Sequence, residues 1–194
     1  LAGATYQELA AAGGGILATV RATREASEAR LVEEGLRWLD RLALCGTTTV
    51  EVKSGYGLTT ADELKQLRAI REMGRRHLLD VVPTFMGAHE VPMEYRGRRE
   101  EYIDLIVDEM LPAVAAEPGL AAFVDVFTEE GVFSVAESRR ILRRAQELGF
   151  RVKLHADELS NLGGAALAAE LRAVSADHLL HASAEGLAAM AKAG

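Results

Sequence analysis

The residues best suited to acid–base or metal chemistry lie in short clusters, each following a run of apolar or β-branched residues. The sharpest cluster is His-Ala-Asp-Glu at 155–158, directly after the run at 151–154. An imidazole with a carboxylate three residues further on can direct both groups at one water molecule, as hydrolysis requires. His89 and His178 follow two other runs of this kind. Imidazole nitrogens there suit a divalent metal such as zinc or iron, or the polarisation of a substrate carbonyl.

The strands that precede these clusters must position them. Strands are predicted over residues 47–53, 78–85, 122–127, 151–154 and 174–180. Helical patterns separate them, and both Thr60 with Glu63 and Ser134 with Glu137 have the spacing of a capping box at a helix start. Alternating strands and helices indicate a parallel sheet, in a doubly wound domain or in a barrel. Because polar clusters follow several strands and no Gly-rich phosphate-binding sequence occurs, the pattern favours the active face of a (β/α)8 barrel.

Local pattern gives further expectations for single residues. Asp177 and His178 are adjacent in the last strand, where successive side chains point to opposite faces, so we expect only His178 to face the barrel interior. Cys45 is the only cysteine and has apolar neighbours, which predicts a buried, reduced thiol in a cytoplasmic protein. His77 and His181 are expected to be structural.

The composition limits the class of ligand. The 194 residues are 49% hydrophobic and 26% charged, as in one globular domain that can bury a core. A formal net charge of -7 leaves no basic surface for nucleic acid or an anionic membrane. No stretch approaches the roughly 20 apolar residues of a membrane span. We therefore expect a small-molecule ligand, and neither nucleic acid nor a membrane as a partner.

Three internal motifs resemble the imidazolonepropionase family of the amidohydrolase superfamily, which acts in histidine degradation. They are Lys-Ser-Gly-Tyr-Gly-Leu at 53–58, Pro-Thr-Phe-Met-Gly-Ala-His at 83–89 and Lys-Leu-His-Ala-Asp-Glu at 153–158. The opening at residues 4–16 and the segment 175–179 are also similar to that family. The resemblance covers essentially the whole chain, in order. It implies a metal-dependent hydrolase that opens the ring of 4-imidazolone-5-propanoate to give N-formimidoyl-L-glutamate.

The resemblance also implies roles for individual residues. His155 matches a residue that binds the metal, iron or zinc. Glu158 matches a residue that contacts the substrate and is a candidate to orient or deprotonate the attacking water, and His178 one placed to act on substrate or water. The positions expected to bind substrate besides Glu158 are Tyr56, His89 and Tyr6.

The chain also departs from the family pattern. The family has a His-x-His metal pair on its first barrel strand and a metal-binding Asp on its last, and neither is found here. We therefore expect residues 1–194 to form a single partial barrel domain, about strands two to six, without the flanking small β domain. One metal ligand is too few for a closed site, so weak metal binding, no turnover and marginal solubility are expected of the chain alone. A homodimer is expected by analogy.

Two other interpretations stay open. In the first, the chain shares the metal chemistry but acts on another substrate, as another cyclic-amide amidohydrolase or a deaminase does. Alternatively, it is a non-catalytic barrel remnant that acts as a binding module. No arginine can be assigned to the substrate propionate, because Arg96, Arg98 and Arg99 fit a solvated charge run better than a substrate clamp.

Overall fold

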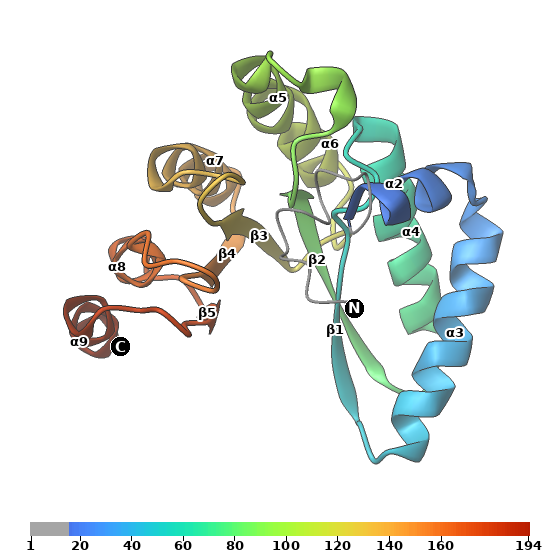
Figure 1. Cartoon of the computed structure of the whole chain (residues 1–194). Coiled ribbons are helices and arrows are strands. Elements are labelled where there is room, and N and C mark those ends of the chain that lie inside the picture. The colour runs from blue at the N-terminus through green and yellow to red at the C-terminus, as the bar shows by residue number, and fades with distance from the viewer. Residues whose placement is uncertain (1–15) are drawn as a thin grey trace, which may run out of the picture.

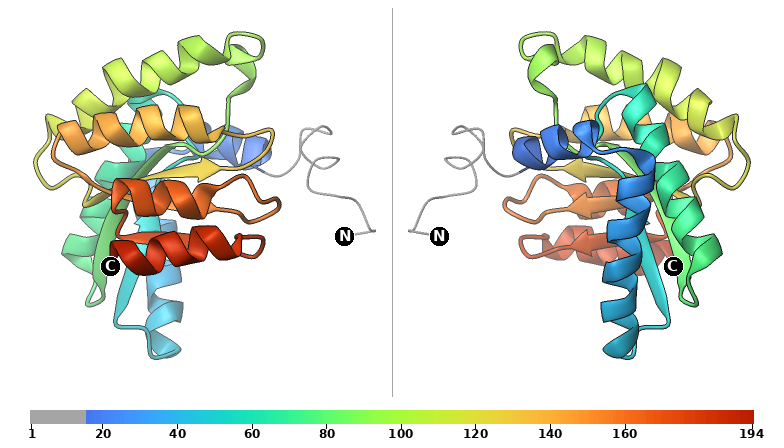
Figure 2. Two further views of the ribbon diagram at one scale, coloured as in Figure 1. Left: turned by 90° about the vertical axis from the view of Figure 1, so that its left-hand side faces the viewer. Right: turned by 90° about the vertical axis from the view of Figure 1, so that its right-hand side faces the viewer.

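The structure is a five-stranded parallel sheet that curls, with helices along its outer side (Figures 1 and 2). This computed structural model describes residues 16–194, so Tyr6 and the helix expected near residues 4–12 lie outside the described residues. The strands follow one another across the sheet in chain order. They are β1 (Thr49–Lys53), β2 (Asp80–Ala88), β3 (Phe123–Thr128), β4 (Arg151–Ala156) and β5 (Ser175–His178). The predicted α/β fold, a partial TIM-type barrel, is confirmed.

A helix or a group of helices lies between each pair of successive strands. The helices are α2 (Ile16–Glu25), α3 (Glu28–Leu44), α4 (Thr60–Arg76), α5 (Arg99–Asp104), a π-helical stretch (Leu105–Met110), α6 (Leu111–Ala115), α7 (Val135–Glu147), α8 (Gly164–Leu171) and α9 (Ala184–Ala193). A short 3-10 turn, Met93–Tyr95, precedes α5. These connections are the crossovers that parallel neighbours require.

Side-chain caps start several of the helices. The capping box of Ser134 and Glu137 at the start of α7 is confirmed, with both reciprocal hydrogen bonds present. The box predicted for Thr60 and Glu63 is wrong. The N-cap of α4 is Thr59, whose hydroxyl accepts from the backbone N–H of Asp62. Glu63 is thereby free to turn toward the loop after β1.

The two faces of the sheet differ in chemistry. Val124, Val126 and Leu154 are completely buried in the core on the helical side. The residues between them on β3 and β4 face the concave side of the curl, and among these are Asp125 and His155. Apolar packing therefore holds the helices to the sheet, while the concave face carries both polar side chains and the ring of Phe127.

Two further observations concern the surface. Cys45 is exposed, contrary to expectation, because it follows the end of α3, beyond the helix's buried residues Val32 and Leu39. Among residues 16–194, no helix is both long enough and apolar enough to cross a membrane.

Candidate active site at the carboxyl ends of the strands

A row of aromatic rings runs along the carboxyl ends of all five strands. Tyr56 and His89 have ring centroids 4.9 Å apart, and His89 lies 6.1 Å from Phe127. Phe127 lies 5.9 Å from His155, which is 5.2 Å from His178. The structure thus brings together four of the residues predicted for the site. Phe127, on β3, was missed because an apolar residue inside a strand reads as core.

Glu158 adds a carboxylate to one end of this row. Its Oε2 lies 3.3 Å from Nε2 of His178, and the two side chains are 27% and 36% exposed. Both groups can therefore reach a ligand on the concave face. The ring of His155, one strand inward, lies next to that of His178, so two imidazoles and one carboxylate follow one another along this end of the row.

The expectation that Asp177 points away from the barrel interior is wrong. Asp177 lies beside His155 in the register of β4 with β5, and its carboxylate reaches the polar cluster on the concave face. His178 also reaches the site because its backbone is left-handed, with φ of 72°, as is that of Leu179 at 59°. Strand alternation ends where the backbone leaves the extended region, so neighbouring residues can serve the same face.

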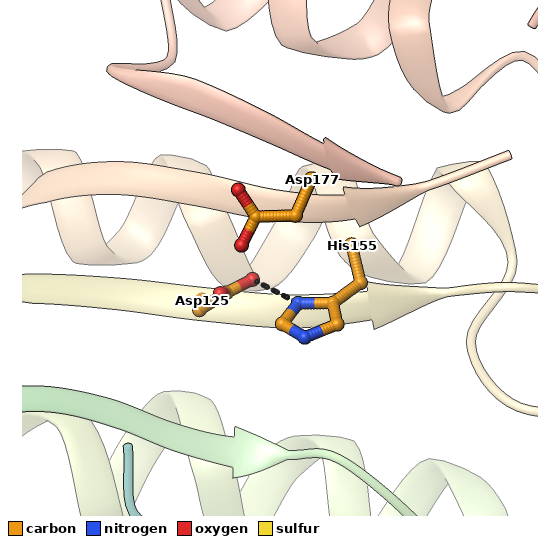
Figure 3. A group of neighbouring side chains, drawn as sticks. All are labelled: Asp125, His155 and Asp177. Atoms are coloured by element: carbon orange, nitrogen blue, oxygen red, sulfur yellow. Dashed lines mark hydrogen bonds and ion pairs between the residues drawn. The ribbon is translucent and has the colours of Figure 1, made fainter. Parts of the chain in front are cut away.

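Asp125, His155 and Asp177 form the cluster drawn in Figure 3. Each offers one possible ligand atom, and these atoms lie within 4.8 Å of one another. However, Nζ of Lys53 lies 2.6 Å from Oδ2 of Asp125 and 2.9 Å from Oδ2 of Asp177. One ammonium therefore already pairs with both carboxylates. The residues therefore fit a zinc or iron ion best through one imidazole of His155, not through the two aspartates.

The charged groups in this cluster keep one another ionised. Burial raises the pKa of Asp125, but its hydrogen bond with His155 and its ion pair and hydrogen bond with Lys53 outweigh burial and hold the pKa of this carboxyl below its ordinary value. Burial lowers the pKa of Lys53, but Asp125 and Asp177 outweigh it and raise the pKa above the ordinary lysine value. The cluster is therefore an ion-pair network at neutral pH.

Burial also fixes the charge of the two groups at the other end of the row. It lowers the pKa of His89 below the ordinary histidine value, although a hydrogen bond to the carbonyl of Gly55 opposes this. The ring atom in that bond is Nδ1, 3.0 Å from the Gly55 oxygen. Burial also raises the pKa of Tyr56. At neutral pH these groups are therefore a neutral imidazole, with Nε2 as the acceptor, and a protonated phenol.

Glu63 holds the loop that carries Tyr56. Its buried carboxylate accepts backbone N–H groups from Gly55, Gly57 and Leu58, at 2.9 to 3.2 Å. The sequence indicated a capping residue, since the spacing from Thr60 fits that role. Its actual partners depend on how the loop folds back over α4.

Two buried carboxylates hold the loop that carries Glu158. Asp157 accepts four backbone N–H groups from residues 162–165, each at 2.9 or 3.0 Å. Glu129 accepts the N–H of Leu159 at 2.8 Å and that of Ser160 at 3.3 Å. Asp157 lies in the cluster at 155–158 that the sequence singled out for chemistry, and Glu129 directly follows β3. The structure uses them to fix backbone.

A curled parallel sheet with histidines and carboxylates along its carboxyl ends defines a partial barrel of the enzyme-bearing (β/α) class. No family model matches the sequence. The chain is 79% identical over 194 residues to an imidazolonepropionase of Symbiobacterium thermophilum. It is 54% identical over 194 residues to one of Alkaliphilus metalliredigens and 58% identical over 191 residues to one of Clostridium tetani.

These matches include essentially all of the chain but only part of each relative. The chain covers 46% of the length of the first two proteins and 45% of the third. It is therefore a homologue of imidazolonepropionases over a segment that spans less than half of their length.

Proposed function

We propose that this chain supplies part of the active site of a hydrolase that opens 4-imidazolone-5-propanoate to N-formimidoyl-L-glutamate. The supporting observation is the match of the whole chain to imidazolonepropionases. In this chain Glu158 pairs with His178, whose ring lies next to that of His155. In the reaction, water adds across the amide C–N bond of the ring. Its oxygen joins the carbonyl carbon, and a proton goes to the departing ring nitrogen. A cytoplasmic location and a homodimer stay predictions.

Glu158 is the group to which we assign the proton transfer. Its side chain is 27% exposed, and its Oε2 lies 3.3 Å from Nε2 of His178. A carboxylate in this position takes a proton from the attacking water and returns it to the ring nitrogen as the bond breaks. His178 orients that carboxylate and offers an imidazole to the substrate or the water.

The other end of the row binds the substrate. Tyr56 offers a phenol O–H, and the neutral ring of His89 offers an acceptor at Nε2. Phe127 lies between His89 and His155 and supplies an apolar surface for the planar imidazolone ring. Tyr6, outside the described residues, is proposed as a further contact on the resemblance alone.

His155 is the residue that would hold the metal, zinc or iron, through its Nε2 atom. When bound there, the metal would supply an acidified water and polarisation of the carbonyl under attack. A closed or catalytic zinc site takes three or four protein ligands. We therefore propose that residues 1–194, as a single partial catalytic domain, bind metal weakly and do not turn over alone.

A chimera tests the function. The matching segment of the Symbiobacterium thermophilum relative is replaced with this chain, and loss of 4-imidazolone-5-propanoate is followed by its ultraviolet absorbance. We expect the chimera to open the ring, and Glu158→Gln to lower kcat by about 100-fold or more, the typical contribution of a general base. Glu33→Gln, at an exposed position of α3, is the matched control and should leave kcat unchanged.

The outcomes separate the proposal from its alternatives. A folded chimera that does not open this ring, although the intact relative does, would contradict the proposal. Turnover of a different cyclic amide or an aminated base would favour another amidohydrolase or a deaminase. Binding of the substrate without turnover would favour a binding module. Measurable ring opening by the purified 194-residue chain would contradict its proposed inactivity.

A further inference from the structure

Asp125 occupies the centre of the polar cluster on the concave face. Its side chain is completely buried, and each oxygen has its own partner. Oδ1 lies 3.1 Å from Nδ1 of His155, and Oδ2 accepts from Nζ of Lys53 at 2.6 Å. The carboxylate therefore joins β3 to the neighbouring strand β4 and to the more distant strand β1.

This arrangement decides which nitrogen of His155 carries a proton. An ionised carboxylate only accepts hydrogen bonds, so Nδ1 must be the donor. A neutral imidazole that donates from Nδ1 has its lone pair on Nε2. In Figure 3 the Nδ1 edge of the ring faces Asp125, and the opposite edge points away from both carboxylates.

Lys53 supports the assignment of the His155 tautomer because it restricts the rotation of the Asp125 carboxylate. With Lys53 on Oδ2, the carboxylate cannot turn away from His155 without losing an ion pair that is buried on the aspartate side. Lys53 also binds Asp177 at 2.9 Å, so the ammonium lies between the two carboxylates. Asp177 thus shares the lysine with Asp125.

We propose that Asp125 is a positioning residue that holds His155 as the Nδ1–H tautomer and directs the Nε2 lone pair to the open side of the row. Lys53 holds Asp125 in place. The aspartate acts through His155 and does not itself bind a metal. The statement that Nε2 binds a metal ion rests on the proposed function. The assignment of the Nδ1–H tautomer does not.

The first experiment is nitrogen-15 NMR of the histidine rings in the 194-residue chain, at neutral pH and without added metal. We expect Nδ1 of His155 to be protonated and Nε2 not. An Nε2-protonated ring in this unaltered chain would overturn the proposal, whatever the variants do.

Asp125→Asn gives a directional test. Lys53 needs an oxygen acceptor, so the Asn carbonyl should stay with Lys53 and its NH2 group should face Nδ1 of His155. The ring should then switch to the Nε2–H tautomer. Asp177→Asn is the matched control, because it also alters a carboxylate on Lys53 but should leave the His155 tautomer unchanged. An unchanged tautomer in Asp125→Asn would overturn the proposal.

The zinc affinity of the chimera, measured by competition with a chelating dye, tests the link to metal binding. We expect Asp125→Asn to weaken binding of Zn²⁺ 10- to 100-fold, as loss of a carboxylate partner of a metal-binding histidine does. Asp177→Asn should change it by less than about threefold, since one lost charge near a solvated site has a small effect. Equal weakening by both variants would show a general charge effect and overturn the positioning role in metal binding. If the chimera is inactive but the tautomer and the zinc difference are as expected, the proposed function fails and this inference stands.

Discussion

Two groups of carboxylates lie at the same edge of the sheet and serve different purposes. Glu63, Glu129 and Asp157 are buried, and their oxygens accept backbone N–H groups of the loops after β1 and β4. Glu158 is half-buried and pairs with His178. The first three carboxylates fix the loops, whereas Glu158 keeps a partly exposed carboxylate beside an imidazole. The hydrogen-bond partners of a carboxylate, not its position after a strand, distinguish the two uses.

The largest expected effect comes from breaking the strongest backbone anchor. Asp157→Ala leaves four N–H groups without an acceptor, two of them at the buried residues Gly164 and Ala165. It also places Ala at φ of 49°, a conformation that Asn and Asp tolerate better. We expect a loss of about 3 kcal/mol or more in the free energy of unfolding, measured by urea denaturation.

Two variants show whether this loss comes from the anchor. Asp157→Asn keeps one oxygen acceptor and suits the positive φ, so its loss should be smaller than that of Asp157→Ala. Asp108→Ala, at an exposed site, should change stability by no more than about 0.5 kcal/mol. A similarly small change in Asp157→Ala would contradict the structural role.

The anchor of the first loop should have a somewhat smaller effect. Glu63→Gln keeps one acceptor oxygen but loses the charge that binds the N–H groups of Gly55, Gly57 and Leu58. We expect a loss of about 2 kcal/mol in unfolding free energy, because hydrogen bonds to charged groups exceed neutral ones. Hydrogen exchange should speed up at these three amides and remain unchanged in the loop after β4.

A matched control for this variant lies on the same helix. Glu72→Gln, whose carboxylate forms only a local pair with Arg75, should change neither the stability nor the exchange rates appreciably. If Glu63→Gln accelerated exchange equally in both loops, the separate anchoring of each loop would be wrong.

Acid should loosen the loop that carries Glu158. Burial raises the pKa of Glu129, but hydrogen bonds from Ser160, Leu159 and Glu130 outweigh it and lower the pKa below the ordinary value of 4.5. A group with a lowered folded-state pKa stabilises the fold fully above its ordinary pKa and loses this contribution as the pH falls through the lowered value. Amide NMR signals of Leu159 and Ser160 should therefore hold steady down to about pH 5 and shift below it.

Glu129→Gln isolates this acid response. The variant cannot ionise, so its Leu159 and Ser160 signals should lack the transition seen in the unaltered chain. A transition of the same size in the variant would assign the acid response to another group.

The sequence predicted the fold because its signals are local. The five strands and the helices between them follow from apolar periodicity, and Ser134 with Glu137 marks the start of α7 as expected. The gathering of His89, His155 and His178 also follows, since parallel strands end at one edge of the sheet. Their chemical roles remain proposals.

The rest depends on contacts between distant residues. Lys53 joins Asp125 and Asp177, which lie 72 and 124 residues further along the chain, and no local pattern marks that pairing. Asp177 and His178 face one side together because His178 adopts a left-handed backbone, which is uncommon for residues other than glycine. The role of Glu63 likewise depends on the path of a neighbouring loop.

The smallest expected effect on stability is at Glu158, and it separates this carboxylate most clearly from those that anchor backbone. Its side chain is 27% exposed, and its ion pair with His178 is also partly solvated, so the pair contributes little to stability. Glu158→Gln should therefore change the unfolding free energy of the 194-residue chain by no more than about 0.5 kcal/mol, measured by the same urea denaturation. The same substitution is expected to lower kcat of the chimera by about 100-fold or more. A loss as large as that of Asp157→Ala would place Glu158 among the backbone anchors and leave the proton transfer without its residue.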